Sequence, residues 1–217
     1  MRVVIAGGHG QIALSLERQL TLRADEAIGL VRNPDHAADL ADVGATAVVL
    51  DLEQASVDEV VAELHGVDAV VFAAGAGPGS GAPRKDTVDR GAAVLMADAA
   101  EQAGVRRYIL ISSMGAGGEP PPGTDDVFAA YLRAKRASEE DLRMRDLDWT
   151  ILRPGRLTND DGTGRVTLSD SAQRGAVPRE DVAAVVVGLL DTPSTAGATL
   201  ELVAGDVPVA EAIAQLA

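Results

Sequence analysis

The sequence has no cysteine, few aromatic residues and few basic residues for its size. The absence of cysteine excludes disulfides, thiolate nucleophiles and cysteine-based metal sites, and it suits a reducing compartment. One Trp, two Tyr and two Phe cannot build a stacking platform for single-stranded nucleic acid. The 19 Lys and Arg against 33 Asp and Glu give a net charge of −14, which disfavours long-range attraction to nucleic acid or to an anionic membrane. An anionic ligand therefore needs a local binding site.

Long hydrophobic runs are missing as well. The longest apolar stretch, VAAVVVGLL at 182–190, is far shorter than the roughly 18 residues of a membrane span. The apolar run near the first residue, VVIA, is shorter than the roughly 7 to 15 residues of a signal peptide core. We therefore expect a cytoplasmic protein that binds neither nucleic acid nor membrane. With three histidines and no H-x-x-x-H pair, we also expect no metal site.

What the sequence does contain is a regular alternation of strand-like and helix-like segments. Hydrophobic residues make up 47% of the 217 residues, so we expect one globular domain over 1–217. Short apolar runs predict strands at 2–6, 27–31, 46–50, 68–74, 107–112, 148–152 and 199–203. Helical periodicity predicts helices at 11–22, 35–43, 56–65, 85–103, 125–145, 179–191 and 208–216. Such alternation predicts an α/β fold: a doubly wound parallel sheet of about seven strands with helices on both faces.

Irregular loops follow three of these strands at the carboxyl edge of the predicted sheet, where open α/β sheets bind ligands. They lie at 75–83, 115–123 and 153–164. Thr124 is the expected N-cap of the helix that follows, with Asp125 and Asp126 in its first turn. The segment 156–178 is the only one left to shape a substrate pocket.

The stretch VVIAGGHGQIA, at residues 3–13, carries the first binding signal. It fits the dinucleotide fingerprint in two registers, Gly8-x-Gly10-x-x-Ala13 and Gly7-x-x-Gly10-x-x-Ala13. Both place Gly10 at a helix N-terminus, where backbone N–H groups can receive a pyrophosphate. A purely steric glycine turn is the alternative, but the position between the first strand and an amphipathic helix favours cofactor binding. His9 is expected to be an exposed loop residue rather than a base or metal ligand.

Arg32 follows the second predicted strand, in LVRNP. An NAD-dependent dehydrogenase usually presents Asp or Glu to the ribose 2′-hydroxyl at this point. The guanidinium of Arg32 could instead pair with a 2′-phosphate, which predicts NADP(H) in preference to NAD(H). The alternative is a solvated arginine in the turn before Pro34.

Several short motifs occur in one order along the chain: GGHGQIA, VRNP, LDL at 50–52, AAGAG at 73–77, ISS at 111–113, YLRAK at 131–135 and LRPG at 152–155. In these motifs, from residue 2 to about residue 210, the chain resembles an atypical short-chain dehydrogenase/reductase of the small NAD(P)H-binding, epimerase-like group. The resemblance implies a Rossmann fold with NADP across Gly7, Gly10, Gln11 and Ile12. It also implies that Arg32 contacts the 2′-phosphate, Asp51 and Leu52 the adenine, and Ala73, Ala74 and Gly75 the adjoining ribose. Ser112, Lys135, Pro154 and Gly155 would flank the nicotinamide.

Tyr131 and Lys135 form the candidate catalytic pair. Residues four apart lie on one helix face, so the Lys135 ammonium can stabilise a Tyr131 phenolate that exchanges a proton with a carbonyl or alcohol. The family's set adds a serine near the end of the fifth strand, for which Ser113 is our choice over Ser112. A Tyr131 that only packs at the surface is the alternative. The chain also departs from the extended family members at Met114, where they keep a serine or threonine.

These features predict an NADP-dependent oxidoreductase that transfers hydride to or from a small carbonyl or quinone substrate. Two alternatives remain open: a non-catalytic NADPH-binding redox sensor and a nucleotide-sugar epimerase-like enzyme. The expected partner is a small-molecule substrate or none, and the chain is expected to be a monomer or homodimer. Neither a G-x-S-x-G elbow nor a P-loop with Gly-Lys-Ser/Thr occurs, so hydrolase and P-loop functions are not expected.

Overall fold

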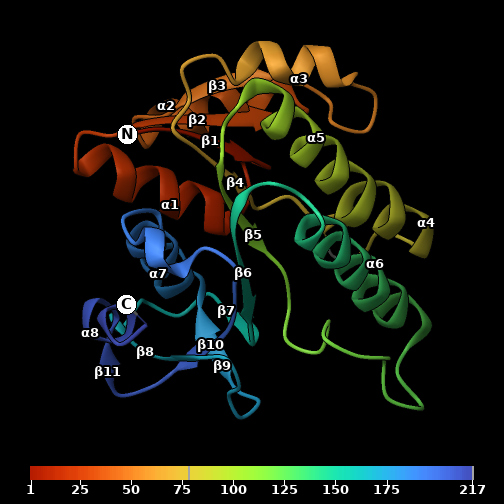
Figure 1. Cartoon of the computed structure of the whole chain (residues 1–217), viewed down its shortest axis with the longest axis vertical. Coiled ribbons are helices and arrows are strands. Elements are labelled where there is room, and N and C mark those ends of the chain that lie inside the picture. The colour runs from red at the N-terminus through yellow and green to blue at the C-terminus, as the bar shows by residue number, and fades with distance from the viewer. Residues whose placement is uncertain (78, 217) are drawn as a thin grey trace.

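A computed structural model describes residues 1–77 and 79–216, and in it one large sheet runs through the molecule (Figure 1). Its strand order is β11-β8-β10-β6-β5-β4-β1-β2-β3. The strands from β10 to β3 in this order run parallel. In chain order they are β1 (Arg2–Ala6), β2 (Glu26–Val31), β3 (Thr46–Val49), β4 (Ala69–Phe72), β5 (Arg107–Ile111), β6 (Asp148–Pro154) and β10 (Ala198–Ala204). The predicted doubly wound parallel sheet is therefore confirmed.

Four strands come from segments for which the sequence analysis predicted no strand. β8 (Arg165–Ser169) pairs antiparallel with β10, and β11 (Val207–Pro208) pairs antiparallel with β8 at the end of the sheet. β7 (Arg156–Thr158) and β9 (Ala176–Pro178) form a separate two-stranded parallel sheet. β7, β9 and β11 have only two or three residues, and β8 alternates between exposed and buried residues, so none shows the continuous apolar run of a strand buried on both faces. The segment 156–178 is thus folded rather than a bare loop.

Helices cover both faces of the sheet (Figure 1). One core forms under α1 (Gln11–Leu22), α2 (Ala37–Asp42), α7 (Arg179–Leu190) and α8 (Val209–Ala214). The other forms under α3 (Val57–Glu63), α5 (Ala93–Ala103) and α6 (Asp126–Arg143). Successive residues of β1 alternate between them: Val3 and Ile5 belong to the first core, and Val4 and Ala6 to the second. This alternation is why the parallel strands read as unbroken apolar runs.

Two helix predictions need correction. The helix expected at 85–103 begins earlier, as α4 (Ala82–Arg84), passes through a π-helix, η2 (Lys85–Ala92), and ends as α5. The N-cap of α6 is Asp125 rather than Thr124, because its carboxylate accepts from the backbone N–H groups of Val127 and Phe128, both at 3.0 Å. The predicted loop at 75–83 contains Pro78, which lies outside the described residues.

The order β3-β2-β1-β4-β5-β6 reverses direction between β1 and β4. β1 continues to β2 on one side, whereas β4 continues to β5 on the other. At such a switch point the loops after neighbouring strands turn away from each other and leave a crevice at the carboxyl edge. The fold therefore brings the loops after β1, β2, β4, β5 and β6 to one edge. Within the described residues, no helix is long and apolar enough to cross a membrane.

Candidate functional site

The glycine loop after β1 owes its shape to two of its three glycines. Gly7 has a positive φ of 82°, and a Cβ there would lie 2.7 Å from the Ala74 Cα, so a side chain would collide with the loop after β4. Gly10 is the N-cap of α1, and its N–H donates to the Gly7 carbonyl at 2.9 Å. Gly8 has another role, since a Cβ there would lie 2.6 Å from the Gly29 Cα of β2. The geometry matches the register Gly7, Gly10, Ala13.

The N-terminus of α1 opens onto this loop. The helix begins at Gln11, and the N–H groups of its first turn, which includes Ile12, have no carbonyl partner within the helix. Ala13 is fully buried beneath the turn, where a small side chain lets the helix approach the sheet. A phosphate placed at this end would meet the positive end of the helix dipole.

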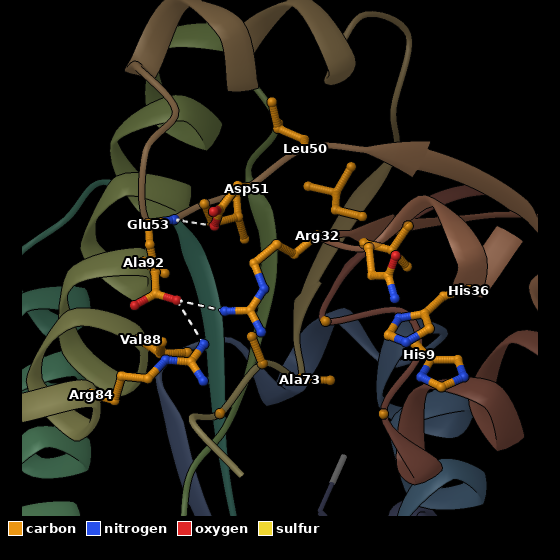
Figure 2. Close-up of a pocket in the computed structure, with 18 residues that line it drawn as sticks. His9, Arg32, His36, Leu50, Asp51, Glu53, Ala73, Arg84, Val88 and Ala92 are labelled. Atoms are coloured by element: carbon orange, nitrogen blue, oxygen red, sulfur yellow. Dashed lines mark hydrogen bonds and ion pairs between the residues drawn. The ribbon is translucent and has the colours of Figure 1, made fainter. Parts of the chain in front are cut away.

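A first cavity of about 310 Å³ lies beside the glycine loop (Figure 2). It is formed by the segments that follow β1, β2, β3 and β4, with one wall from η2. Most of the residues expected to bind the cofactor line it, namely Gly7, Gly10, Arg32, Asp51, Leu52, Ala73, Ala74 and Gly75. Gln11 and Ile12 lie next to it, on the first turn of α1. Residues that the sequence analysis selected from separate segments of the first 75 positions thus line one cavity, and their role in binding the cofactor stays a prediction.

Arg32 shares this cavity with a second arginine that the sequence analysis did not select. Figure 2 shows Arg32 and Arg84 directed at the same Glu53 carboxylate, with nitrogen–oxygen distances of 3.0 and 2.7 Å. Hydrogen bonds from Arg84 and Thr87 and the charge of Arg32 hold the pKa of Glu53 below its ordinary value. Glu53 and the nearby Asp51 balance the two guanidinium charges, and Glu53 holds both guanidinium groups in place at the cavity. An incoming anion would thus meet an arginine pair that is already positioned.

Two histidines close the opposite side of the first cavity. The His9 and His36 rings are stacked with their centroids 3.5 Å apart, and His9 Nε2 lies 2.7 Å from Asp39 Oδ2 (Figure 2). His9 therefore ties the glycine loop to η1 (Pro34–His36) and to α2. Across residues 1–77 and 79–216, no group of three or more His, Asp or Glu side chains could hold a metal ion.

A second cavity, of about 520 Å³, lies on the other side of the switch point, at the ends of β5 and β6. Ser113, Tyr131, Pro154 and Gly155, all selected from the sequence, line it. The Tyr131 ring is stacked on the ring of Phe128, with centroids 5.8 Å apart. The structure therefore brings the candidate tyrosine, a serine hydroxyl and the Pro154-Gly155 turn to one hollow.

Lys135 is held below Tyr131 by buried partners. Its Nζ lies 5.9 Å from the centre of the Tyr131 ring, 3.4 Å from Asp89 Oδ1 and 3.1 Å from the Ile111 carbonyl, to which it donates. The Lys135 and Asp89 side chains are 4% and 0% exposed, so water barely screens the pair. A second cation, Lys85, lies 5.5 Å from the Tyr131 ring centre. Lys85 and Asp89 both belong to the π-helix η2, and π-helical turns often occur at functional sites.

Ser112 was expected to flank the nicotinamide together with Lys135, but its side chain does not line the second cavity. Its hydroxyl is buried and donates to Glu139 Oε1 at 2.5 Å, so it faces α6 rather than the second cavity. Burial alone would raise the pKa of Glu139, but hydrogen bonds from Arg153 and Ser112 outweigh burial and hold this pKa below its ordinary value. Of the two serines, Ser113 is the one that lines the cavity.

Sequence reasoning missed a further set of residues at the two cavities: His36, Glu53, Arg84, Lys85, Asp89, Phe128, Arg156, Arg174 and Arg179. None belongs to a short motif, because these residues come from several elements that are far apart in the sequence. One signal was available. Arg156, Arg174 and Arg179 fall within or beside the one segment expected to shape a substrate pocket, in a chain with few basic residues.

The chain was compared with known protein families, curated proteins and solved structures. A family described as NAD(P)H-binding matches residues 7–193. A Bacillus subtilis protein named "Uncharacterized sugar epimerase YhfK" is 35% identical over 217 residues, covering 100% of both chains. A Bacillus halodurans structure named "Putative NAD-dependent epimerase/dehydratase" is 36% identical, with a TM-score of 0.91 and 99% of each chain covered. The structure of the oxidoreductase ylbE from Lactococcus lactis is 26% identical, with a TM-score of 0.87, covering 100% of this chain and 96% of that one.

These matches agree with the features of the fold. The family match begins at Gly7, the first glycine of the loop, and continues through both cavities as far as η3 (Pro193–Thr195). The chain belongs to the family described as NAD(P)H-binding, and its relatives include proteins named as a sugar epimerase and as an oxidoreductase.

Proposed function

We propose that this protein is an NADP-dependent oxidoreductase that transfers hydride between the nicotinamide and a small carbonyl or quinone substrate. The observation that carries the proposal is the second cavity, where Tyr131 and Ser113 face one hollow and Lys135 is fixed one helical turn from Tyr131. The first cavity would hold the adenosine half of the cofactor, and the glycine loop between the two cavities its pyrophosphate.

The residues fit a bound dinucleotide. Because Gly7 has no side chain, the backbone of Ala74 can approach it closely. The loop is thereby left open to a phosphate at the first turn of α1. Arg32 and Arg84 support the choice of NADP. Glu53 holds both guanidinium groups at the first cavity, so a 2′-phosphate placed beside them would gain charge-assisted hydrogen bonds there.

NADPH, when bound, supplies the hydride. Tyr131 would donate its Oη proton to the carbonyl oxygen as the carbonyl is reduced, and Ser113 Oγ would hydrogen-bond to the same oxygen. The positive charge of Lys135 favours the phenolate that remains on Tyr131. Asp89 and the Ile111 carbonyl keep the Lys135 ammonium in place, because a buried ammonium needs hydrogen-bond partners and an opposite charge.

The test is oxidation of NADPH, followed by its absorbance, with a panel of quinones, flavins and aldehydes. Turnover by the wild-type protein is expected to fall about a hundredfold or more in Tyr131→Phe, since loss of a general acid removes a factor of that order. Tyr108→Phe is the matched control: Tyr108 is buried in β5, away from both cavities. NADPH binding without oxidation by any acceptor would favour the redox sensor instead. Unchanged turnover in Tyr131→Phe would remove Tyr131 from the chemistry.

A further inference from the structure

Three arginines surround the second cavity, and the small β7–β9 sheet brings them together. Arg156 is the first residue of β7 and pairs with Ala176 of β9, Arg174 lies just before β9, and Arg179 directly follows it. The backbones of Gly155 and Gly175 approach so closely that a Cβ on Gly155 would collide with the Gly175 carbonyl. The glycines therefore let segments about twenty residues apart place their arginines on one hollow.

These arginines differ from most others in the chain in their partners. Arg23, Arg106 and Arg145 each pair with two or more carboxylates. Within residues 1–77 and 79–216, none of the three cavity arginines forms an ion pair. Arg179 donates instead to the side-chain oxygen of Asn159 at 2.5 Å. The Arg174 guanidinium lies beside Gly115, near the Ser113-Met114 turn.

A concentration of uncompensated positive charge is unusual in a chain of net charge −14. At physiological ionic strength the Debye length is about 8 Å, so most of the distant acidic residues are screened from a molecule in the cavity. The arginines at the cavity are close enough to act on it directly. An anion is therefore repelled by the protein as a whole but attracted locally at the second cavity.

The remaining lining of the cavity is largely apolar and partly aromatic. Met114 and Leu157 contribute aliphatic walls, and Phe128, stacked on Tyr131, is 48% exposed. Phe128 is one of the few large apolar side chains that the fold leaves in contact with solvent. An exposed aromatic ring beside a reacting tyrosine suits a flat apolar ligand.

We propose that the second cavity binds a substrate with a flat apolar body and an anionic group, a carboxylate or a phosphate. Arg156, Arg174 and Arg179 hold the anion, while Phe128 contacts the flat body and Tyr131 faces the carbonyl. This substrate class rests on the proposed function, because it takes the cavity of Tyr131 to be the substrate site. Anion binding itself does not depend on turnover and can be measured separately.

The experiment is a calorimetric titration of the full chain with benzoate, phenyl phosphate and benzamide, with and without saturating NADP+. The three probes share a ring and differ in the charge that the arginines would meet. Variants Arg156→Gln and Arg174→Gln remove one positive charge each from exposed positions. Arg18→Gln is the matched control, since Arg18 is an exposed residue of α1 that lies outside both cavities.

The wild-type protein is expected to bind at least one of the two anions about tenfold more tightly than benzamide, the gain of one charge-assisted hydrogen bond. Each cavity variant should lose about threefold to tenfold in anion affinity, with benzamide and the Arg18→Gln protein unaffected. The tighter of the two anions identifies the group as carboxylate or phosphate. Equal affinities for all three probes, or anion affinity unchanged in both cavity variants, would overturn the substrate class. Arginine-dependent anion binding without NADPH oxidation by any acceptor would instead count against the proposed function alone.

Discussion

The most unusual residue under the cofactor loop is Glu17, and replacing it by glutamine should change how stability depends on pH. Glu17 occupies a core position of α1, beside the buried residues Ala13, Leu16 and Leu20, and it is 0% exposed. Within the described residues, neither of its carboxylate oxygens has a hydrogen-bond partner. A Cβ on Gly29 would lie 2.5 Å from Glu17 Oε1, so the carboxyl group is packed against bare backbone.

Burial raises the pKa of Glu17 from its ordinary value of 4.5 to about 8. The folded protein therefore keeps a proton that the unfolded chain releases at lower pH. Because the folded state binds more protons between these two pKa values, the free energy of unfolding falls as pH rises from 4.5 to about 8 and is constant beyond. At about 1.4 kcal/mol per pKa unit, the total loss is on the order of 5 kcal/mol.

Glutamine cannot ionise, so Glu17→Gln should remove this loss. The variant should equal the wild type near pH 4.5 and be more stable by several kcal/mol near pH 8. Urea unfolding of both proteins at each pH unit from about 5 to 8 measures the difference, and other titrating groups cancel in it. Glu211→Gln, at an exposed glutamate of α8, is the control and should give parallel curves. Parallel curves for Glu17→Gln as well would refute the reasoning and show that Glu17 is ionised in the folded protein.

Two further predictions concern the cofactor. Arg32→Ala should weaken NADPH binding about tenfold and leave NADH binding unchanged. Tenfold is the low end for the loss of a charge-assisted hydrogen bond, and we expect it because the Arg32 side chain is 55% exposed. Equal losses for both nucleotides in calorimetry would show that Arg32 does not contact the 2′-phosphate. Gly10→Val should abolish the thermal stabilisation by both nucleotides. Its own melting temperature should fall, because a Cβ on Gly10 would lie 3.1 Å from the Gly7 carbonyl oxygen, but the fold should survive since Gly10 has an ordinary φ of −66°. Retained stabilisation by the nucleotides would remove the phosphate from this loop.

The parallel sheet and most of the first cavity were predictable because both depend on local patterns. Buried strands such as β1 and β5 are continuous apolar runs, and the glycine loop is a compact motif between a strand and a helix. β7, β9 and β11 could not be found in this way, because they have only two or three residues and pair through contacts between distant segments, such as Gly155 against Gly175. β8 has five residues that alternate between exposed and buried, a local signal that the sequence analysis overlooked.

The candidate site divides along the same line. Tyr131 and Lys135 are four residues apart on one helix, so the sequence alone relates them. Lys135 and Asp89 are brought together only by the packing of α6 against η2, and Glu53 joins Arg32 to Arg84 from three separate elements. No feature of the sequence distinguishes Ser112 from Ser113. The backbone geometry at the end of β5 decides that Ser113 lines the cavity and that the Ser112 hydroxyl reaches Glu139.

The central claim, hydride transfer in the cavity of Tyr131, is tested most directly with NADPH deuterated at the transferable position of the nicotinamide. The wild-type protein is incubated with aldehydes that carry a carboxylate group and with aldehydes that do not. The alcohol products are analysed by mass spectrometry. The account predicts deuterium on the former carbonyl carbon with the wild-type protein and Tyr108→Phe, and transfer slowed about a hundredfold or more with Tyr131→Phe. Binding of NADPH with no deuterium in any product, or equally fast transfer by Tyr131→Phe, would contradict it.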